Sequence, residues 1–326
     1  MPENRYENPG GPARPTPRPG QEHFTAPVDE GGLGAVDAVR ADDAPTSLWG
    51  DAWHAMRRRW LFWVSAAVIV LVILVAAFPG LFTSVDPRVC DLSKALQGPQ
   101  AGHPFGFDRQ GCDIYSRTVY GARSSVVVGV LATVMVVLLG TTIGAVAGYY
   151  GKWFDTILSR ITDIFFAIPL VLAAIVIMSV TADRTSFLVA FVLALFGWTQ
   201  IARITRGTVM SVKNNEFVTA ARSLGMSRGQ ILVQHVLPNS SAPIIVYATV
   251  ALGQFIVAEA TLSFLGIGLP PSVVSWGGDI SAAQGAIRTD PEILLYPAGG
   301  LALTVLGFMM MGDVVRDALD PKARKR

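Results

Sequence analysis

The sequence predicts an all-α membrane protein with about six transmembrane helices. Of its 326 residues, 51% are hydrophobic and only 15% are charged, and the mean hydropathy is +0.45. This composition is typical of an integral membrane protein and not of a soluble domain. Six apolar segments approach or exceed the ~20 residues that a helix needs to cross a bilayer, and they are roughly 60–82, 125–148, 164–182, 186–204, 242–264 and 293–312.

Lysine and arginine near the ends of these segments predict the orientation. Arg57, Arg58 and Arg59 directly precede the first segment, so the positive-inside rule places the N-terminus in the cytoplasm. Alternation through six crossings then puts the basic loop at about 206–239 and the basic C-terminal residues 322–326 on the same side. The external loops also carry some positive charge, but less. We expect a multi-pass protein with both termini in the cytoplasm.

The chain divides into three regions. Residues 1–47 are rich in proline and glycine and have no apolar run, which predicts a disordered cytoplasmic tail and not a signal peptide, with a docking role as the alternative. Residues 48–124 should hold an interfacial lead-in, the first transmembrane helix and an external loop. Residues 125–320 should form the main transmembrane domain, with a cytoplasmic loop at about 206–239.

The insert 216–239 is polar, basic and patterned as helix between strongly apolar segments. Phe217, Ala220, Ala221 and Leu224 recur at helical spacing and should form one stripe. Because two of the four are alanines, another body could approach the helix backbone closely along this stripe. The insert is therefore interpreted as a docking surface, and an ordinary solvated helical hairpin is the alternative.

Local signals set the expected ends of the insert's helices. Glu216 sits where the positive end of a helix favours a carboxylate, and Gly225 sits where a left-handed cap would end that helix. Ser227 and Gln230 have the spacing of a capping box that opens a second short helix. Pro238 is expected to end this second helix.

The external loop between the first two segments holds the only two cysteines, Cys90 and Cys112. Both lie on the predicted outer side, where disulfides persist. Closing a loop of about 22 residues would contribute on the order of 3 kcal/mol to local order. A disulfide is favoured, and two unpaired thiols remain the alternative.

Charged residues near the outer face have two possible interpretations. Asp108, Asp113 and Arg117 form either a charged substrate gate or a hydrogen-bonded loop scaffold, and the scaffold is favoured. Glu259 lies near the outer end of the fifth segment, where an intramembrane carboxylate is a functional candidate by default. It is expected instead to tie the following glycine-rich turn through backbone N–H groups, while Trp276 is suited to the membrane interface.

Three motifs resemble bacterial ATP-binding-cassette importer permeases. Ala220-Ala221, followed by Gly225 and Leu237-Pro238, resembles their "EAA" loop, although Thr219 stands where the family has glutamate. The run from His103 to Arg117 resembles the H-x-x-G-T-D-x-x-G-R-D-x-x-S-R signature of peptide-class permeases, with Phe and Cys replacing the usual Thr and Arg. Residues 259–277 closely resemble the E-A-x-L-S-F-L-G-x-G-x-x-P-P…S-W-G run of C-type subunits of dipeptide, oligopeptide and nickel permeases.

The resemblance implies a type I ABC importer permease fold that moves di- or oligopeptides, with nickel or haem-like cargo as the alternative. It implies a second permease subunit, two ABC ATPase subunits, an extracytoplasmic substrate-binding protein and a lipid membrane as partners, and no nucleic acid. It implies no cofactor on this chain, since ATP and magnesium belong to the ATPases. The insert would be the coupling helix, with the ATPase-coupling residues Glu216, Phe217, Thr219, Ala220, Ala221, Leu224 and Gly225.

Other function classes fit the sequence less well. The chain has no Gly-x-x-x-x-Gly-Lys-Ser/Thr run, so it is not expected to hydrolyse ATP itself. Its four histidines are scattered and form no H-E-x-x-H pair, and no G-x-S-x-G occurs, which disfavours a membrane enzyme. An ion-coupled secondary transporter is disfavoured because Asp163, Arg203 and Glu259 all lie near segment ends and not at their centres.

Overall fold

The computed structural model describes residues 48–319. The predicted tail 1–47 and the basic residues 322–326 lie outside the described residues. Within residues 48–319 the regular elements are helices, as expected for an all-α protein. Five of these helices are long and apolar enough to cross a membrane, and a bent helix pair counts as a sixth crossing if its two halves are one span.

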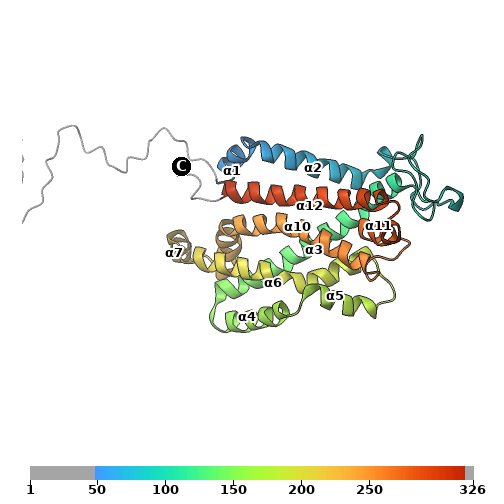
Figure 1. The fold of residues 1–326 in the computed structure, drawn as a ribbon. Helices are drawn as coiled ribbons and strands as arrows, with labels where there is room; N and C mark the ends of the chain where they lie inside the picture. The colour runs from blue at the N-terminus through green and yellow to red at the C-terminus, as the bar shows by residue number, and fades with distance from the viewer. Residues whose placement is uncertain (1–47, 320–326) are drawn as a thin grey trace, which may run out of the picture. The chain divides into compact units, whose positions relative to one another are not determined.

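The long helices run side by side in Figure 1, with the short helices at their ends. The α-helices, in chain order, are α1 (Leu48–Arg57), α2 (Trp60–Ala77), α3 (Ile114–Tyr150), α4 (Lys152–Ala167), α5 (Leu170–Ser179), α6 (Ser186–Val212), α7 (Glu216–Ser223), α8 (Arg228–Ile231), α9 (Leu237–Asn239), α10 (Ser241–Phe264), α11 (Trp276–Ala283) and α12 (Glu292–Leu319).

The third predicted span is wrong as a single helix. In place of one segment over 164–182, α4 begins at Lys152 and meets α5 at a 76° bend. The break falls at Ile168 and Pro169, where Ile168 has the extended ψ of 119°. Proline lacks an N–H for the helix and disfavours helical geometry in the residue before it, so the chain turns there.

The helix that contains the second predicted span begins earlier than the predicted boundary. α3 starts at Ile114 and continues to Tyr150, a helix of 37 residues, so the external loop ends at Asp113 and not near residue 123. The predicted boundary between residues 124 and 125 therefore lies inside a helix. The cause is local, because the Asp113 carboxylate accepts a hydrogen bond from the Ser116 N–H at 2.8 Å and caps the first turn.

Three glycines of α3 form its contact with α6. Gly140, Gly144 and Gly148 recur every four residues and lie on one face of the helix. A Cβ on Gly144 would be only 2.3 Å from the Ala202 carbonyl oxygen, so the two backbones touch without intervening side chains. Such small-residue packing lets membrane helices gain close van der Waals contact where lipid offers no hydrophobic driving force.

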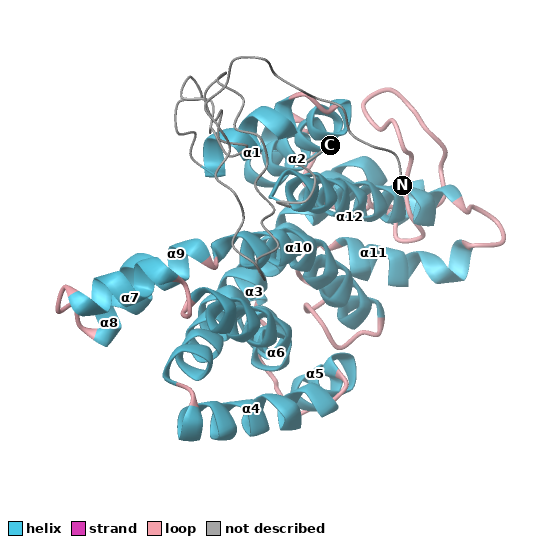
Figure 2. Cartoon of the chain, turned by 90° about the vertical axis from the view of Figure 1, so that its left-hand side faces the viewer, coloured by secondary structure: helices cyan, strands magenta, loops and turns pink. Residues whose placement is uncertain are grey.

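The other helices flank this central pair. Seen along the bundle in Figure 2, α10, α12 and α2 lie on one side of α3 and α6, and α4 and α5 lie on the other. A buried cluster that includes Val72, Val126, Ile256 and Phe308 joins α2, α3, α10 and α12. Helix α1 contacts α12, and an ion pair between Arg59 and Asp317 links the start of α2 to the end of α12.

Candidate coupling surface and external polar cluster

The insert protrudes beyond one end of the bundle in Figure 1, and Figure 2, which looks along the bundle, shows that it also extends to one side. Its first helix, α7, ends at the predicted glycine: Gly225 has φ +82°, a left-handed conformation that glycine adopts without steric cost. The Gly225 N–H donates to the Arg222 carbonyl at 3.0 Å, and the Met226 N–H donates to the Ala221 carbonyl at 3.2 Å. These bonds satisfy the carbonyls at the end of α7.

The second part of the insert departs from the prediction. The capping box is present, because Gln230 N–H donates to Ser227 Oγ at 3.3 Å and Ser227 N–H donates to Gln230 Oε1 at 3.0 Å. Pro238, however, does not end the helix. After α8 the chain passes through a π-helical segment, Leu232–Val236, into α9, and Pro238 lies in the first turn of α9, where no N–H is needed.

Ala221 does not lie on an open docking surface, which corrects the predicted stripe. It is 6% exposed and packs with Val218 against Ile231 and Leu232. The helix turns this face toward the rest of the insert, since burying Val218 there removes its apolar side chain from water. The alanine pair is therefore divided, with Ala221 inside and Ala220 exposed.

The opposite side of α7 is open. Five residues, here called the α7 surface, are all exposed: Glu216, Phe217, Thr219, Ala220 and Leu224. Leu224 is 84% exposed although it is apolar. Gly225, next to it, has no neighbouring atoms within 4 Å of where a side chain would begin. An exposed leucine and phenylalanine on an otherwise polar helix are typical of a protein-binding surface.

The insert is connected to the bundle by polar and apolar contacts. At the end of α6, from which the insert leaves the bundle, Lys213 Nζ donates to the Gly148 carbonyl of α3 at 2.6 Å, and Arg206 makes two hydrogen bonds to Asp155 of α4, at 2.5 and 2.8 Å. The buried cluster around Ala221 also includes Tyr149 of α3 and Val209 of α6. A displacement of α7 would therefore be transmitted to α3 and α6.

On the opposite end of the bundle, the structure joins Cys90 and Cys112 by a disulfide. Cys112 is completely buried and directly precedes the capping residue of α3. The Asp91 N–H also donates to the Gly111 carbonyl at 3.0 Å. The disulfide thus fastens the external loop to the start of α3.

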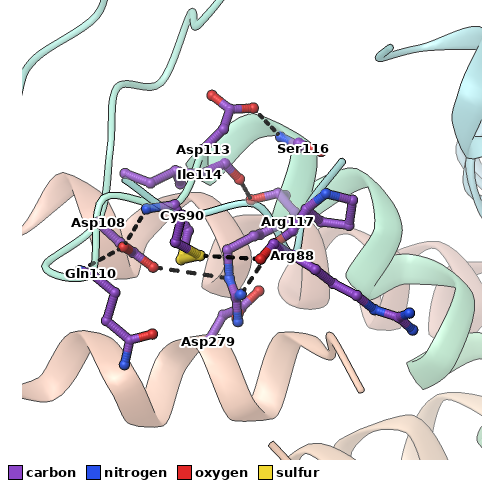
Figure 3. Close-up of polar contacts among 12 residues, drawn as sticks. Arg88, Cys90, Asp108, Gln110, Asp113, Ile114, Ser116, Arg117 and Asp279 are labelled. Atoms are coloured by element: carbon purple, nitrogen blue, oxygen red, sulfur yellow. Dashed lines mark hydrogen bonds and ion pairs between the residues drawn. A yellow bond between two sulfur atoms is a disulfide. The ribbon is translucent and has the colours of Figure 1, made fainter. Parts of the chain in front are cut away.

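The aspartates of the external loop are engaged within it (Figure 3). Asp108 Oδ1 accepts hydrogen bonds from the backbone N–H groups of Gln110 at 2.8 Å and Cys112 at 2.9 Å. Asp113 caps α3 with one oxygen, and its other oxygen lies 3.0 Å from Nδ1 of His103. Both carboxylates shape the loop, which favours the scaffold interpretation over the gate.

Arg117 pairs with a residue that sequence reasoning missed, Asp279 of α11. Its Nε donates to Asp279 Oδ1 at 2.9 Å, and its guanidinium lies 4.0 Å from Asp108 (Figure 3). Asp279 is 9% exposed, and this burial raises its pKa to about 6, although the Arg117 charge opposes the shift. The only feature of the sequence that could have indicated this pairing is that an aspartate, Asp279, follows the Trp276-Gly277 of the third motif by two residues.

Glu259 reaches the glycine-rich turn indirectly. It is completely buried, and Ser263 Oγ donates to its Oε1 at 2.7 Å while accepting from the Leu269 N–H at 3.1 Å. The predicted direct bonds to backbone N–H groups are therefore replaced by one serine. The turn needs glycine where Gly268 passes Ser263, since a Cβ there would lie 2.4 Å from the serine nitrogen.

Trp276 is buried within the chain. It is 3% exposed, and its indole N–H donates to the Thr118 carbonyl at 2.9 Å. Its ring fits beside Gly121 of α3 and Gly300 of α12. The tryptophan thereby ties α11 to the bundle and holds Asp279 next to Arg117.

The bundle has five or six candidate spans, a projecting helical insert at one end and a disulfide-fastened loop at the other, which are features expected of a membrane transport subunit of the permease class. Residues 140–325 match the family described as "Binding-protein-dependent transport system inner membrane component". Residues 47–99 match the "N-terminal TM domain of oligopeptide transport permease C". The chain belongs to this family of ABC importer permeases, as the motifs predicted.

Permeases of several bacteria match most of the chain. The dipeptide transport system permease protein DppC of Alkalihalophilus pseudofirmus is 41% identical over 85% of this chain and 91% of its own length. The oligopeptide transport system permease protein OppC of Bacillus subtilis is 39% identical over 89% and 95% of the two chains. The glutathione transport system permease protein GsiD of Escherichia coli is 36% identical over 90% and 96%.

Proposed function

We propose that this chain is one of two permease subunits of an ATP-driven importer that carries di- or oligopeptides across the cytoplasmic membrane. The main observation behind this proposal is the similarity to permeases named for dipeptide and oligopeptide transport, which extends over most of this chain and most of each relative. The α7 surface supports the same proposal, because it is exposed and offers an ATPase subunit a place to bind.

The proposal includes the partners and the orientation. The α7 surface and both termini face the cytoplasm, where one of two ABC ATPase subunits holds α7 and supplies the bound ATP and magnesium. A second, different permease subunit completes the pathway, and an extracytoplasmic substrate-binding protein delivers peptide to the outer face. This chain has no phosphate-binding loop motif of its own, so it acts as a transport subunit and not as the ATPase.

Coupling would follow from the rigid attachment of the insert. Closure of the ATPase pair on ATP displaces α7, and the buried cluster that joins Val218 and Ala221 to Tyr149 of α3 and Val209 of α6 carries this displacement into the bundle. The inward-facing and outward-facing states of the bundle then differ in their contact with the ATPases. That difference is what allows ATP binding to shift the equilibrium between them.

The test is reconstitution of the complex in liposomes, with ATP-dependent peptide uptake and ATPase retention measured together. Leu224→Asp places a charge at an 84% exposed position, so the fold should remain while ATPase binding weakens about tenfold or more. Arg228→Ala, at the exposed start of α8, is the control and should keep both activities. Full ATPase retention and uptake in Leu224→Asp would exclude the α7 surface as the coupling site.

Cargo other than di- and oligopeptides is the second candidate. The similarity to glutathione permeases favours small thiol peptides, and nickel or haem-like cargo remains an alternative within the importer class. Competition of labelled dipeptide uptake by glutathione and by metal chelates would separate these possibilities. Uptake that persists without any ATPase subunit would instead indicate a secondary transporter.

A further inference from the structure

A cavity of about 460 Å³ lies beside the break between α4 and α5. The break itself forms one wall, and α6 and α10 form the others. Aromatic rings supply much of the lining, with Phe165, Phe196 and Phe255 among them. Two carboxamides also line it, Gln200 of α6 and Gln254 of α10.

The two glutamines are unusual for their position. Each lies near the middle of a candidate membrane span and is exposed. Within residues 48–319, neither carboxamide has a hydrogen-bond partner from this chain. A carboxamide facing lipid would leave its N–H and C=O groups unpaired in hydrocarbon, which is unfavourable. The partner of each must therefore be water, another subunit or a solute.

The break between α4 and α5 also indicates that this cavity is a transport site. Irregular backbone within a membrane is tolerated where it lines a cavity or is covered by protein, and discontinuous helices recur at transport sites. Ile168 and Pro169, the residues of the break, both line the cavity. The break and the two glutamines belong to different helices and line the same cavity. They are therefore independent observations that favour a transport site there.

The cavity carries no formal charge. Among its described lining residues there is no Asp, Glu, Lys, Arg or His. The nearby Arg203 is engaged, since its guanidinium lies 3.8 Å from the ring centre of Phe166 and donates to Asp163 at 2.9 Å. A carboxamide both donates and accepts hydrogen bonds, as a peptide group does, and the aromatic rings suit apolar side chains.

We propose that this cavity is the chain's half of the transmembrane path, and that Gln200 and Gln254 hydrogen-bond backbone peptide groups of the passing substrate. The inference rests on the proposed function and adds to it the chemistry that the path recognises. Because the lining is uncharged, the path reads the peptide backbone and accepts acidic, basic and neutral side chains alike.

Transport by a double variant tests the recognition step. Gln200→Leu with Gln254→Leu removes both carboxamides without adding a charge, and import of acidic, basic and neutral dipeptides should fall together by about tenfold while ATP hydrolysis continues. Thr142→Val is the matched control on α3, because Thr142 is exposed and its hydroxyl already donates to the Leu138 carbonyl at 2.7 Å. Normal import by the double variant would overturn the inference.

Thiol labelling tests the path independently of transport. The only two native cysteines are joined to each other, so Gln200→Cys and Gln254→Cys each introduce a single reactive thiol. In the nucleotide-free complex both should react with a small hydrophilic methanethiosulfonate, and dipeptide should slow the reaction, whereas Ala190→Cys, at a fully buried position of α6, should stay unlabelled. Absence of labelling in every nucleotide state would mean that a neighbouring subunit or lipid covers the glutamines, which overturns the proposal. A wild-type complex that imports no peptide would instead overturn the proposed function.

Discussion

Gly144 is the position where the smallest change should have a large effect on the bundle. A Cβ there would lie 2.3 Å from the Ala202 carbonyl oxygen and 2.8 Å from Thr205 Cβ. The first contact is with backbone, which cannot rotate away as a side chain can. Gly144→Ala must therefore separate α3 from α6 locally.

The expected magnitude follows from two opposing effects. Overpacking a close contact costs about 1–3 kcal/mol. Alanine favours a helix over glycine by about 1 kcal/mol, which offsets part of that cost. The net loss for Gly144→Ala should be about 0–2 kcal/mol. Gly207 of α6 has no atom within 4 Å of its would-be Cβ, so Gly207→Ala should instead gain about 0.5–1 kcal/mol.

Thermal unfolding of the purified variants in the same lipid or detergent measures both effects. For a chain of this size a loss of 1 kcal/mol lowers the midpoint by roughly 2–4 °C, so the two variants should move in opposite directions from wild type. If Gly144→Ala is as stable as Gly207→Ala, the α3–α6 backbone contact does not hold the bundle together.

Three further predictions concern the insert and the outer face. Ala220→Phe should leave the insert folded, because Ala220 is exposed. Ala221→Phe should destabilise the insert by about 1–3 kcal/mol, because Ala221 is only 6% exposed. Equal hydrogen-exchange protection of residues 206–239 in the two variants would contradict this prediction. A non-reduced digest should contain the Cys90–Cys112 peptide pair, and free alkylation of both thiols in intact cells would exclude the disulfide. Burial raises the pKa of Asp279 from 3.8 to about 6, so a proton favours the folded state: stability should rise by on the order of 3 kcal/mol as pH falls from above 6 toward 4, and Asp279→Asn should abolish this slope in pH-dependent unfolding.

The sequence motifs identified the insert at one end of the bundle and the cysteine-containing loop at the other, because each motif depends on residues close together in the chain. Gly225 ends α7 through its own backbone freedom, and Ser227 with Gln230 caps α8 through bonds spanning three residues. Apolar length likewise identified most of the spans, since each helix satisfies its own backbone in lipid. The prediction of the third span considered only apolar length, and Pro169 breaks the helix that hydropathy alone had made continuous.

The sequence by itself determined the class of this protein, its family, and the residues that carry its motifs. Only the tertiary structure decided which side of α7 is open, because Val218 competes with the predicted stripe and takes Ala221 inward with it. It also decided that Arg117 pairs with Asp279, and that Gln200 and Gln254 share one cavity with the break after α4. These pairs come from helices distant in the chain, and no periodicity within one helix records which face of another it will meet.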